Sequence, residues 1–211
     1  MMRRQYLLLR PTIQGTPPAP AFYFEDTFTD ADGTLLTAHT PDINPALASW
    51  STTFSSATIE SGAAQVNTPG GYNSAAIDIA RADVYTLTCD IDPAISVPGA
   101  LSDAGVVFRF ADANNFLAFR WRQHGGSDQP GLELWRRVSG SFTRINRTLL
   151  SPAALGEPYS VSIVISGTTI TATVGAASVQ ATNVTQHQTD TAIGLWSEVV
   201  GDRWDNLRVT V

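Results

Sequence analysis

The chain alternates between apolar and polar residues in short runs that are separated by turn-forming residues. Val84–Ile91 alternates strictly, as expected of a strand that buries one face and exposes the other. Other alternating runs are joined by Ser139–Gly140 and by Ser166–Gly167. Because glycine adopts positive φ at little cost, these links predict two-residue hairpin turns. The pattern therefore predicts a series of antiparallel hairpins.

From residue 21 onward, the same pattern predicts about a dozen strands and no amphipathic helix longer than about two turns. Short strands at regular spacing are typical of a β-sandwich or a β-barrel. We expect an all-β fold in which residues 21–211 form one domain. The predicted strand segments are 22–28, 84–91, 105–110, 116–122, 132–138, 142–149, 159–165, 169–174, 193–196 and 204–211.

Residues 1–20 have a different composition, with three arginines, no acid and a short apolar run that is followed by prolines. The apolar run is shorter than the roughly 7–15 residues of an export signal. No segment of the chain approaches the roughly 18 apolar residues of a membrane span. We therefore predict neither an export signal nor a membrane span. Instead, we predict that residues 1–20 form an extended arm that anchors the domain to a larger particle. The predicted anchoring residues are Arg3, Arg4, Tyr6, Leu7, Leu8, Leu9 and Arg10.

Composition narrows the chemistry further. The chain has 13 basic residues, all of them arginine, and a formal net charge of −6. The absence of lysine excludes a phosphate-binding-loop lysine and a Schiff-base lysine. Cys89 is the single cysteine, which excludes an internal disulfide. Seven arginines fall between residues 109 and 147, but the acidic total argues against a nucleic-acid partner.

Several segments, taken in order, resemble the concanavalin A-like, laminin-G-like jelly roll over residues 21–211. The resemblance implies two curved antiparallel sheets and a first strand that pairs with the last. It also implies sugar binding on the concave sheet, as in many family members. The segments that carry it are Phe-Glu-Asp-Thr-Phe at 24–28, Gly-Val-Val-Phe-Arg-Phe at 105–110, Asn-Asn-Phe-Leu-Ala-Phe-Arg at 114–120, Gly-Leu-Glu-Leu-Trp-Arg at 131–136, Tyr-Ser-Val-Ser-Ile at 159–163 and Trp-Asp-Asn-Leu-Arg-Val at 204–209.

The glucan-cleaving members with this fold are similar to one another in a Glu-x-Asp-x-(x)-Glu strand, which supplies a nucleophile and a general acid. None of the five glutamates here is followed two positions later by aspartate. Glu133 lies close in sequence to Arg136 and Arg137, which favours a surface ion pair over an acid catalyst. We therefore expect a non-enzymatic protein.

Side chains alternate between the two faces of a strand, so the predicted strands also predict which residues share a face. If Phe108, Phe119 and Leu134 belong to the core, an aromatic ring lies among arginines on the opposite face. Such a face suits a sugar or an acidic glycan, because a ring can stack and guanidinium groups can donate two parallel hydrogen bonds. A merely solvated face, or one buried against another subunit, remains the alternative. The predicted interaction face comprises Arg109, Arg120, Arg122, Glu133, Trp135 and Arg137.

The family resemblance also implies a structural calcium ion. If the end strands pair, Glu25, Asp26, Asp202 and Asp205 can converge around it. An Asx turn without metal at Asp30–Gly33 is the alternative interpretation. We expect no other cofactor.

Together, these features favour a structural or adhesion protein of a phage-type virion, because similar lectin-like domains occur in capsid decoration, head-fibre and tail accessory proteins of tailed bacteriophages. The particle would assemble in the host cytoplasm, with the arm bound to its capsid or tail proteins. The sandwich would face outward, where it can bind host-surface glycans, and a homo-oligomer is a further possible assembly. A stand-alone bacterial carbohydrate-binding module is the alternative function. A glycoside hydrolase with diverged carboxylates is the third hypothesis.

Overall fold

The computed structural model describes most of the predicted domain. The predicted anchoring residues, Arg3 to Arg10, lie outside the described residues. Within the described part, no helix is long and apolar enough to cross a membrane. The described residues are 22–52, 56–67, 73–81, 83–94, 102–123, 130–150 and 158–211.

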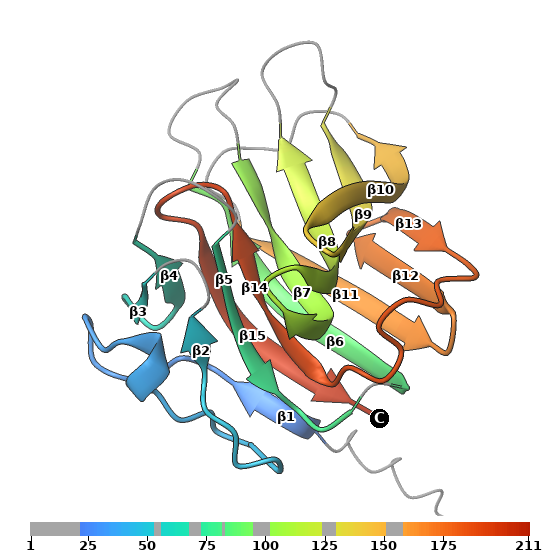
Figure 1. Ribbon diagram of the computed structural model, residues 1–211. Coiled ribbons are helices and arrows are strands. Elements are labelled where there is room, and N and C mark those ends of the chain that lie inside the picture. The colour runs from blue at the N-terminus through green and yellow to red at the C-terminus, as the bar shows by residue number, and fades with distance from the viewer. Residues whose placement is uncertain are drawn as a thin grey trace, which may run out of the picture.

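Two antiparallel sheets lie face to face and form a jelly-roll sandwich, which confirms the predicted fold (Figure 1). The eight-stranded sheet contains β1 (Phe22–Asp26), β3 (Ala57–Ile59), β4 (Ala64–Val66), β6 (Val84–Asp92), β11 (Tyr159–Ser166), β12 (Thr169–Val174), β13 (Ala177–Ala181) and β15 (Arg203–Thr210). The seven-stranded sheet contains β2 (Ser51–Thr52), β5 (Asn73–Asp78), β7 (Ser102–Asp112), β8 (Asn115–Gln123), β9 (Gly131–Val138), β10 (Ser141–Leu149) and β14 (Ala192–Ser197). A single 3-10 turn, η1 (Leu36–Ala38), completes the described elements.

The main core lies between the sheets and follows the alternation of the sequence. In β6, Tyr85, Leu87, Cys89 and Ile91 are all buried, and the residues between them are partly exposed. Strands of the facing sheet contribute the inward side chains that the pattern predicted, among them Phe108 on β7. Burying each large apolar side chain contributes roughly 1.5–3 kcal/mol, so this alternation is a main source of stability.

The first and last strands are neighbours, as the resemblance implied. β1 pairs antiparallel with β15, and Phe24 lies opposite Val209 and Glu25 opposite Arg208. The Arg208 Nε donates to Glu25 Oε1 at 2.8 Å across this pair. The strand is shorter than expected, because Phe28 has a φ of 50° and lies beyond its end.

The seven-stranded sheet is strongly curved, and its outward face is concave. Strands β9, β8 and β7 separate β10 from β14 in the sheet order. Even so, the ring of Phe142 on β10 stacks on Trp196 of β14, with centroids 5.7 Å apart. Figure 1 shows β10 curling across the front of the sheet. The curl turns this face into a trough.

Strands β10 and β13 fasten the two sheets along one edge of the sandwich. Asn146 Nδ2 of β10 donates to the Gln180 carbonyl at 2.6 Å, and Thr148 Oγ1 donates to the Ser178 carbonyl at 2.7 Å. Both acceptors belong to the edge strand β13, so these bonds cover carbonyl groups that an edge strand otherwise presents to other chains.

Candidate functional site

An aromatic cluster fills one part of the concave face. Phe110, Phe116 and Trp196 are buried there, and Trp135 and Phe142 are partly buried against them. Phe116 packs edge-on against both Phe142 and Trp196, with centroids 5.9 and 6.0 Å away. Aromatic pairs in such geometries contribute roughly 0.5–1.5 kcal/mol beyond area burial. The cluster is therefore a second small core on the outside of the sandwich.

Arg120 lies between two tryptophans of this cluster. Its guanidinium carbon is 4.3 Å from the ring centroid of Trp135 and 5.5 Å from that of Trp196. Arg120 also donates to three carboxylates, with Nε 2.9 Å from Glu133 and Nη1 3.3 Å from Asp103 and 3.2 Å from Glu198. Only 5% of its surface is exposed, so Arg120 contacts other residues of the protein rather than a ligand.

Glu133 is the centre of this ion network. It is fully buried, accepts from Trp135 Nε1 at 2.7 Å, and has Arg144 and Arg147 each 3.2 Å from Oε1. Burial alone would raise the pKa of Glu133, but the charge of Arg120 and hydrogen bonds from Trp135 and Arg120 outweigh it and hold the pKa below its usual range. An ionised carboxylate that is saturated with donors cannot act as a general acid.

Asp103 and Glu198 form an acid pair at the end of the network. Burial raises the pKa of Asp103 to about 7, the Arg120 charge opposes that rise, and the charge of Glu198 and its hydrogen bond add to it. With a pKa near 7, Asp103 is protonated in part at neutral pH, unlike an ordinary aspartate.

The structure brings together five of the six residues predicted for the interaction face. Arg120, Arg122, Glu133, Trp135 and Arg137 lie on the concave side, although Arg120 and Glu133 are buried rather than exposed. Arg122 is 3.8 Å from Asp103. Arg137 donates to the Ala113 and Gly140 carbonyls, so its guanidinium fastens two turns together.

Arg109 lies elsewhere, which corrects the prediction. The pairing of β7 with β8 and β14 shifts register after Phe108, and Arg109 has a φ of 48°. This β-bulge turns Arg109 inward, where Nη2 donates to the Gly167 carbonyl of the facing sheet at 2.5 Å. The same shift separates Phe110 from Phe108, which would share a face in a regular strand, and places Phe110 in the aromatic cluster.

Next to the cluster, the concave face holds an open groove of about 450 Å³. Phe110, Ala76 and Ala192 are shared with the aromatic cluster and form the apolar part of its lining. The lining residues are Ala48, Ser49, Ser51, Ala76, Asp78, Phe110, Ala111, Thr189, Asp190, Thr191 and Ala192.

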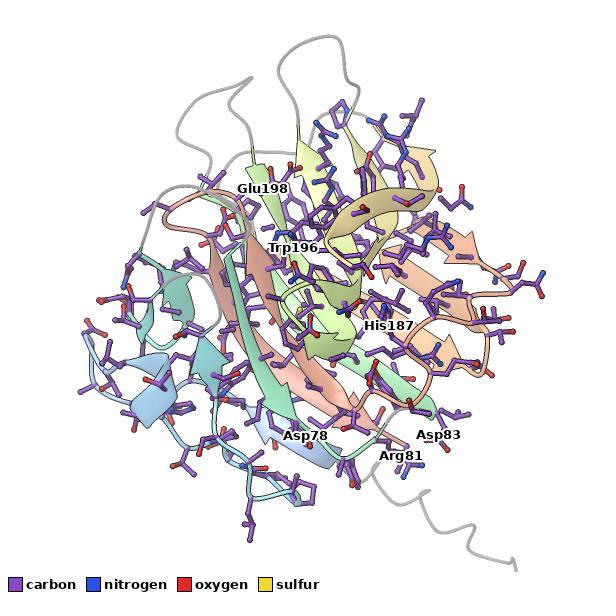
Figure 2. All side chains as sticks on the ribbon, in the orientation of Figure 1. Asp78, Arg81, Asp83, His187, Trp196 and Glu198 are labelled. Carbon is purple, nitrogen blue, oxygen red and sulfur yellow. The ribbon has the colours of Figure 1, made fainter. Side chains whose placement is uncertain are left out.

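Two carboxylates give the groove its polar character. Asp78, at the end of β5 (Figure 2), accepts from Ala80 N at 2.7 Å and Thr191 Oγ1 at 2.6 Å, both through Oδ1. The second oxygen, Oδ2, accepts no hydrogen bond from the described residues. Asp190 Oδ2 lies 3.2 Å from Nδ1 of His187, whose Nε2 reaches the Arg137 carbonyl at 3.1 Å. The sequence pattern did not predict this groove, because its lining is mostly small residues in loops and in a strand that was not predicted.

A buried polar network holds the loop that forms one wall of the groove. His39 bridges Asp26 and Asp30 with ring nitrogens 2.7 and 2.8 Å from their oxygens, and Trp50 Nε1 donates to Asp26 Oδ2 at 2.8 Å. Burial alone would lower the pKa of His39, but the hydrogen bonds and charges of the two aspartates outweigh it and raise the pKa to about 9. Ala48, Ser49 and Ser51 flank Trp50, so this network fixes their position.

The four carboxylates that were expected around calcium are occupied in other ways. Asp26 belongs to the His39 network, and Glu25 pairs with Arg208. Asp202 accepts from Ser197 Oγ at 2.6 Å and from Ala94 N at 2.8 Å, and Asp205 contacts Asn206. Among the described residues, no three histidine, cysteine, aspartate or glutamate side chains are close enough to hold one metal ion.

The outer face of the eight-stranded sheet has two smaller hollows of about 220 and 350 Å³, which share Asp90. Asp90 already accepts hydrogen bonds from Ser160 and Asn206. Trp204 is the aromatic residue among the lining of the two hollows, and it is fully buried. The groove on the concave face therefore offers the better combination of space and open acceptors.

Comparison with solved structures finds similar β-sandwich folds. The carbohydrate-binding module CBM66 from Bacillus subtilis is similar with a TM-score of 0.62 and 14% identity, over 77% of this chain and 95% of that chain. The CBM2 module of the evolved Dit of Lactobacillus casei BL23 phage J-1 has a TM-score of 0.58 and 10% identity, over 89% of this chain and 94% of that chain.

A third similar structure is a variant of the GH43 protein BlXynB from Bacillus licheniformis, with a TM-score of 0.57 and 15% identity, over 90% of this chain and 39% of that chain. No family model and no curated protein sequence matches the chain. At these identities, the similarities establish the fold, and function has to be argued from the site.

Proposed function

We propose that the protein is a non-enzymatic carbohydrate-binding domain whose site is the groove on the concave face. The observation that carries the proposal is the combination of space and chemistry in that groove. A volume of about 450 Å³ lies within the usual range of ligand sites, roughly 300–1,000 Å³. The similar modules from Bacillus subtilis and phage J-1 are named for carbohydrate binding, which supports the proposal.

The lining provides both kinds of contact that a sugar needs. Phe110, which is 8% exposed, forms an apolar floor together with Ala76 and Ala192, and C–H groups of a sugar can pack against this floor. Asp78, Asp190 and the hydroxyl groups of neighbouring serines and threonines offer acceptors for sugar hydroxyls. Hydrogen bonds to ionised carboxylates are about twice as strong as neutral ones, so two aspartates can orient the ligand.

Catalysis is not part of the proposal, because the acidic groups of the ion network are buried and paired. Glu133 is fully buried and paired with arginines, and Asp103 is buried beside Arg120. The similarity to BlXynB covers 39% of that chain, so it also gives no support for hydrolase activity here.

Binding of the full-length chain to a panel of immobilised oligosaccharides tests the proposal. Ala111 is exposed on the lining of the groove, so Ala111→Trp fills the groove without removing a buried contact. Ala176 is exposed in the turn between β12 and β13, and Ala176→Trp provides the matched control. We expect Ala111→Trp to abolish binding and Ala176→Trp to leave it intact. Failure of the unmodified chain to bind any oligosaccharide contradicts the proposal.

We also propose that the domain serves in a phage-type virion, where residues 1–20 bind capsid or tail proteins. The similarity to a module of a phage Dit protein supports this setting. Density-gradient fractionation of a lysate from the producing cells tests it. We expect the chain to sediment with particles, and a chain without residues 1–20 to remain in the soluble fraction. Sedimentation of the full-length chain as free protein would favour a stand-alone bacterial module instead.

A further inference from the structure

The groove has a marked charge asymmetry that the rest of the concave face does not share. Among the described residues, its lining includes the carboxylates of Asp78 and Asp190 and no arginine or histidine, and Asp190 Oδ2 lies 3.2 Å from Nδ1 of His187. Asp78 is exposed, and its Oδ2 accepts no hydrogen bond from the described residues. A ligand in the groove therefore meets negative charge and free acceptor capacity.

The arginines of the same face cannot neutralise that charge. Arg120 is bound by three carboxylates, and Arg137 is bound by two carbonyl groups and lies 4.7 Å over the Phe142 ring. Arg144 contacts Glu133. All three belong to the ion network and the turns beside it, and none lines the groove.

We propose that the groove is selective for uncharged, hydroxyl-rich glycans and excludes glycans that carry carboxylate or sulfate groups. The inference rests on the proposed carbohydrate-binding function and names its ligand class. Sugar hydroxyls donate to the open oxygen of Asp78 and to Asp190, whereas an anionic substituent meets two like charges at short range. This ligand class differs from the one suggested by the arginine-rich sequence pattern, which included acidic glycans.

Asp78→Asn is the decisive variant. Asparagine keeps the shape and an acceptor oxygen for Ala80 N and Thr191 Oγ1, but it replaces the open acceptor by a donor and removes the charge. Asp83→Asn is the matched control, because Asp83 is 73% exposed, pairs with Arg81 at 3.6 Å and does not line the groove. Both variants change the net charge equally, and Figure 2 shows both aspartates.

The experiment measures retention of the full-length protein on a glycan array of neutral hexoses, N-acetylhexosamines, uronates and sulfated sugars at low salt. For the best neutral oligosaccharide, affinity is then compared with that of its counterpart oxidised to a uronic acid at C6. We expect the uronic acid to bind at least tenfold more weakly. We expect Asp78→Asn to weaken neutral binding about tenfold and to narrow the gap between the two sugars, and Asp83→Asn to change neither.

Two results overturn the inference in distinguishable ways. Equal or tighter binding of the uronate or sulfated sugars refutes the selectivity and leaves the carbohydrate-binding function in place. Absence of binding to every glycan on the array refutes both. A uniform loss with Asp83→Asn attributes the effect to net charge rather than to the groove, which also overturns the assignment.

Discussion

The two parts of the concave face carry charge in opposite ways. Around Arg120, positive and negative groups are buried together, and each is held by partners that the protein itself supplies. In the groove, Asp78 is exposed and retains an oxygen without a partner among the described residues. A dense cluster of arginines and acids can therefore stabilise the fold without being accessible to a ligand, whereas the two aspartates of the groove are accessible to one.

The largest effect should come from removing the central charge of the ion network. Glu133→Gln keeps the shape of the side chain but leaves Arg120 buried without its nearest counter-charge, so we expect a loss of about 3–5 kcal/mol in the free energy of unfolding. Asp78→Asn in the groove should change it by less than about 0.5 kcal/mol. Urea denaturation measures the free energy of unfolding of both variants. Similar losses in the two variants would contradict the distinction between the ion network and the groove.

The wall of the groove should respond to alkaline pH. Folded His39 has a pKa of about 9 against an ordinary value of 6.5, so the folded state binds its proton more tightly than the unfolded chain does. Its stabilisation is complete below pH 6.5 and is lost as pH rises through 9, on the order of 3 kcal/mol. Unfolding free energies measured from pH 6 to 10 should fall for the natural chain and stay flatter for His39→Gln. Parallel curves would refute this role.

The acid pair in the ion network should respond at lower pH. Folded Asp103 has a pKa of about 7, raised from 3.8, so the folded state binds this proton more tightly than the unfolded chain does. Stability should therefore decline by on the order of 2 kcal/mol as pH rises from 5 to 7. Asp103→Asn has no proton to release and should lack this decline. Chemical denaturation at pH 5 and pH 7 is sufficient to compare the two proteins. An equal decline in both would assign the effect to other groups.

The smallest effect is expected at Arg144, the most exposed of the arginines that contact Glu133. The Arg144 side chain is 44% exposed, although it contacts the same carboxylate as Arg120. Water screens such a pair, so Arg144→Ala should cost at most about 1 kcal/mol. Thermal or urea unfolding measures this cost. If Arg144→Ala lowers the free energy of unfolding as much as Glu133→Gln does, the exposure of a side chain does not determine how much its ion pair contributes.

The sequence predicted the strands whose apolar and polar residues alternate clearly. β6 to β12 follow the predicted segments closely, and all of them except β10 bury alternate side chains in the main core. Strand β5, Asn73–Asp78, was missed because two alanines occupy its centre and give no strong alternation. That omission also hid the groove, since Ala76 and Asp78 belong to β5.

The candidate site could be predicted only in part, for reasons of geometry. Alternation correctly gathered Arg120, Glu133 and Trp135 on one face. It could not foresee the bulge that turns Arg109 inward, because a bulge depends on pairing with neighbouring strands. It also could not bring Phe142 to Trp196, since that contact requires the curvature of a whole sheet.

The pairing of β1 with β15 has a mechanical consequence. Phe22 lies opposite Thr210, and Asp26 lies opposite Leu207, so the outer ends of both strands meet at one end of the ladder. Tension applied between residues 22 and 210 would load the hydrogen bonds one after another, as in opening a zipper, rather than all together in shear. The β1–β15 pair is therefore expected to open at a lower force when it is pulled between these two points than when its strands are pulled past each other along their length.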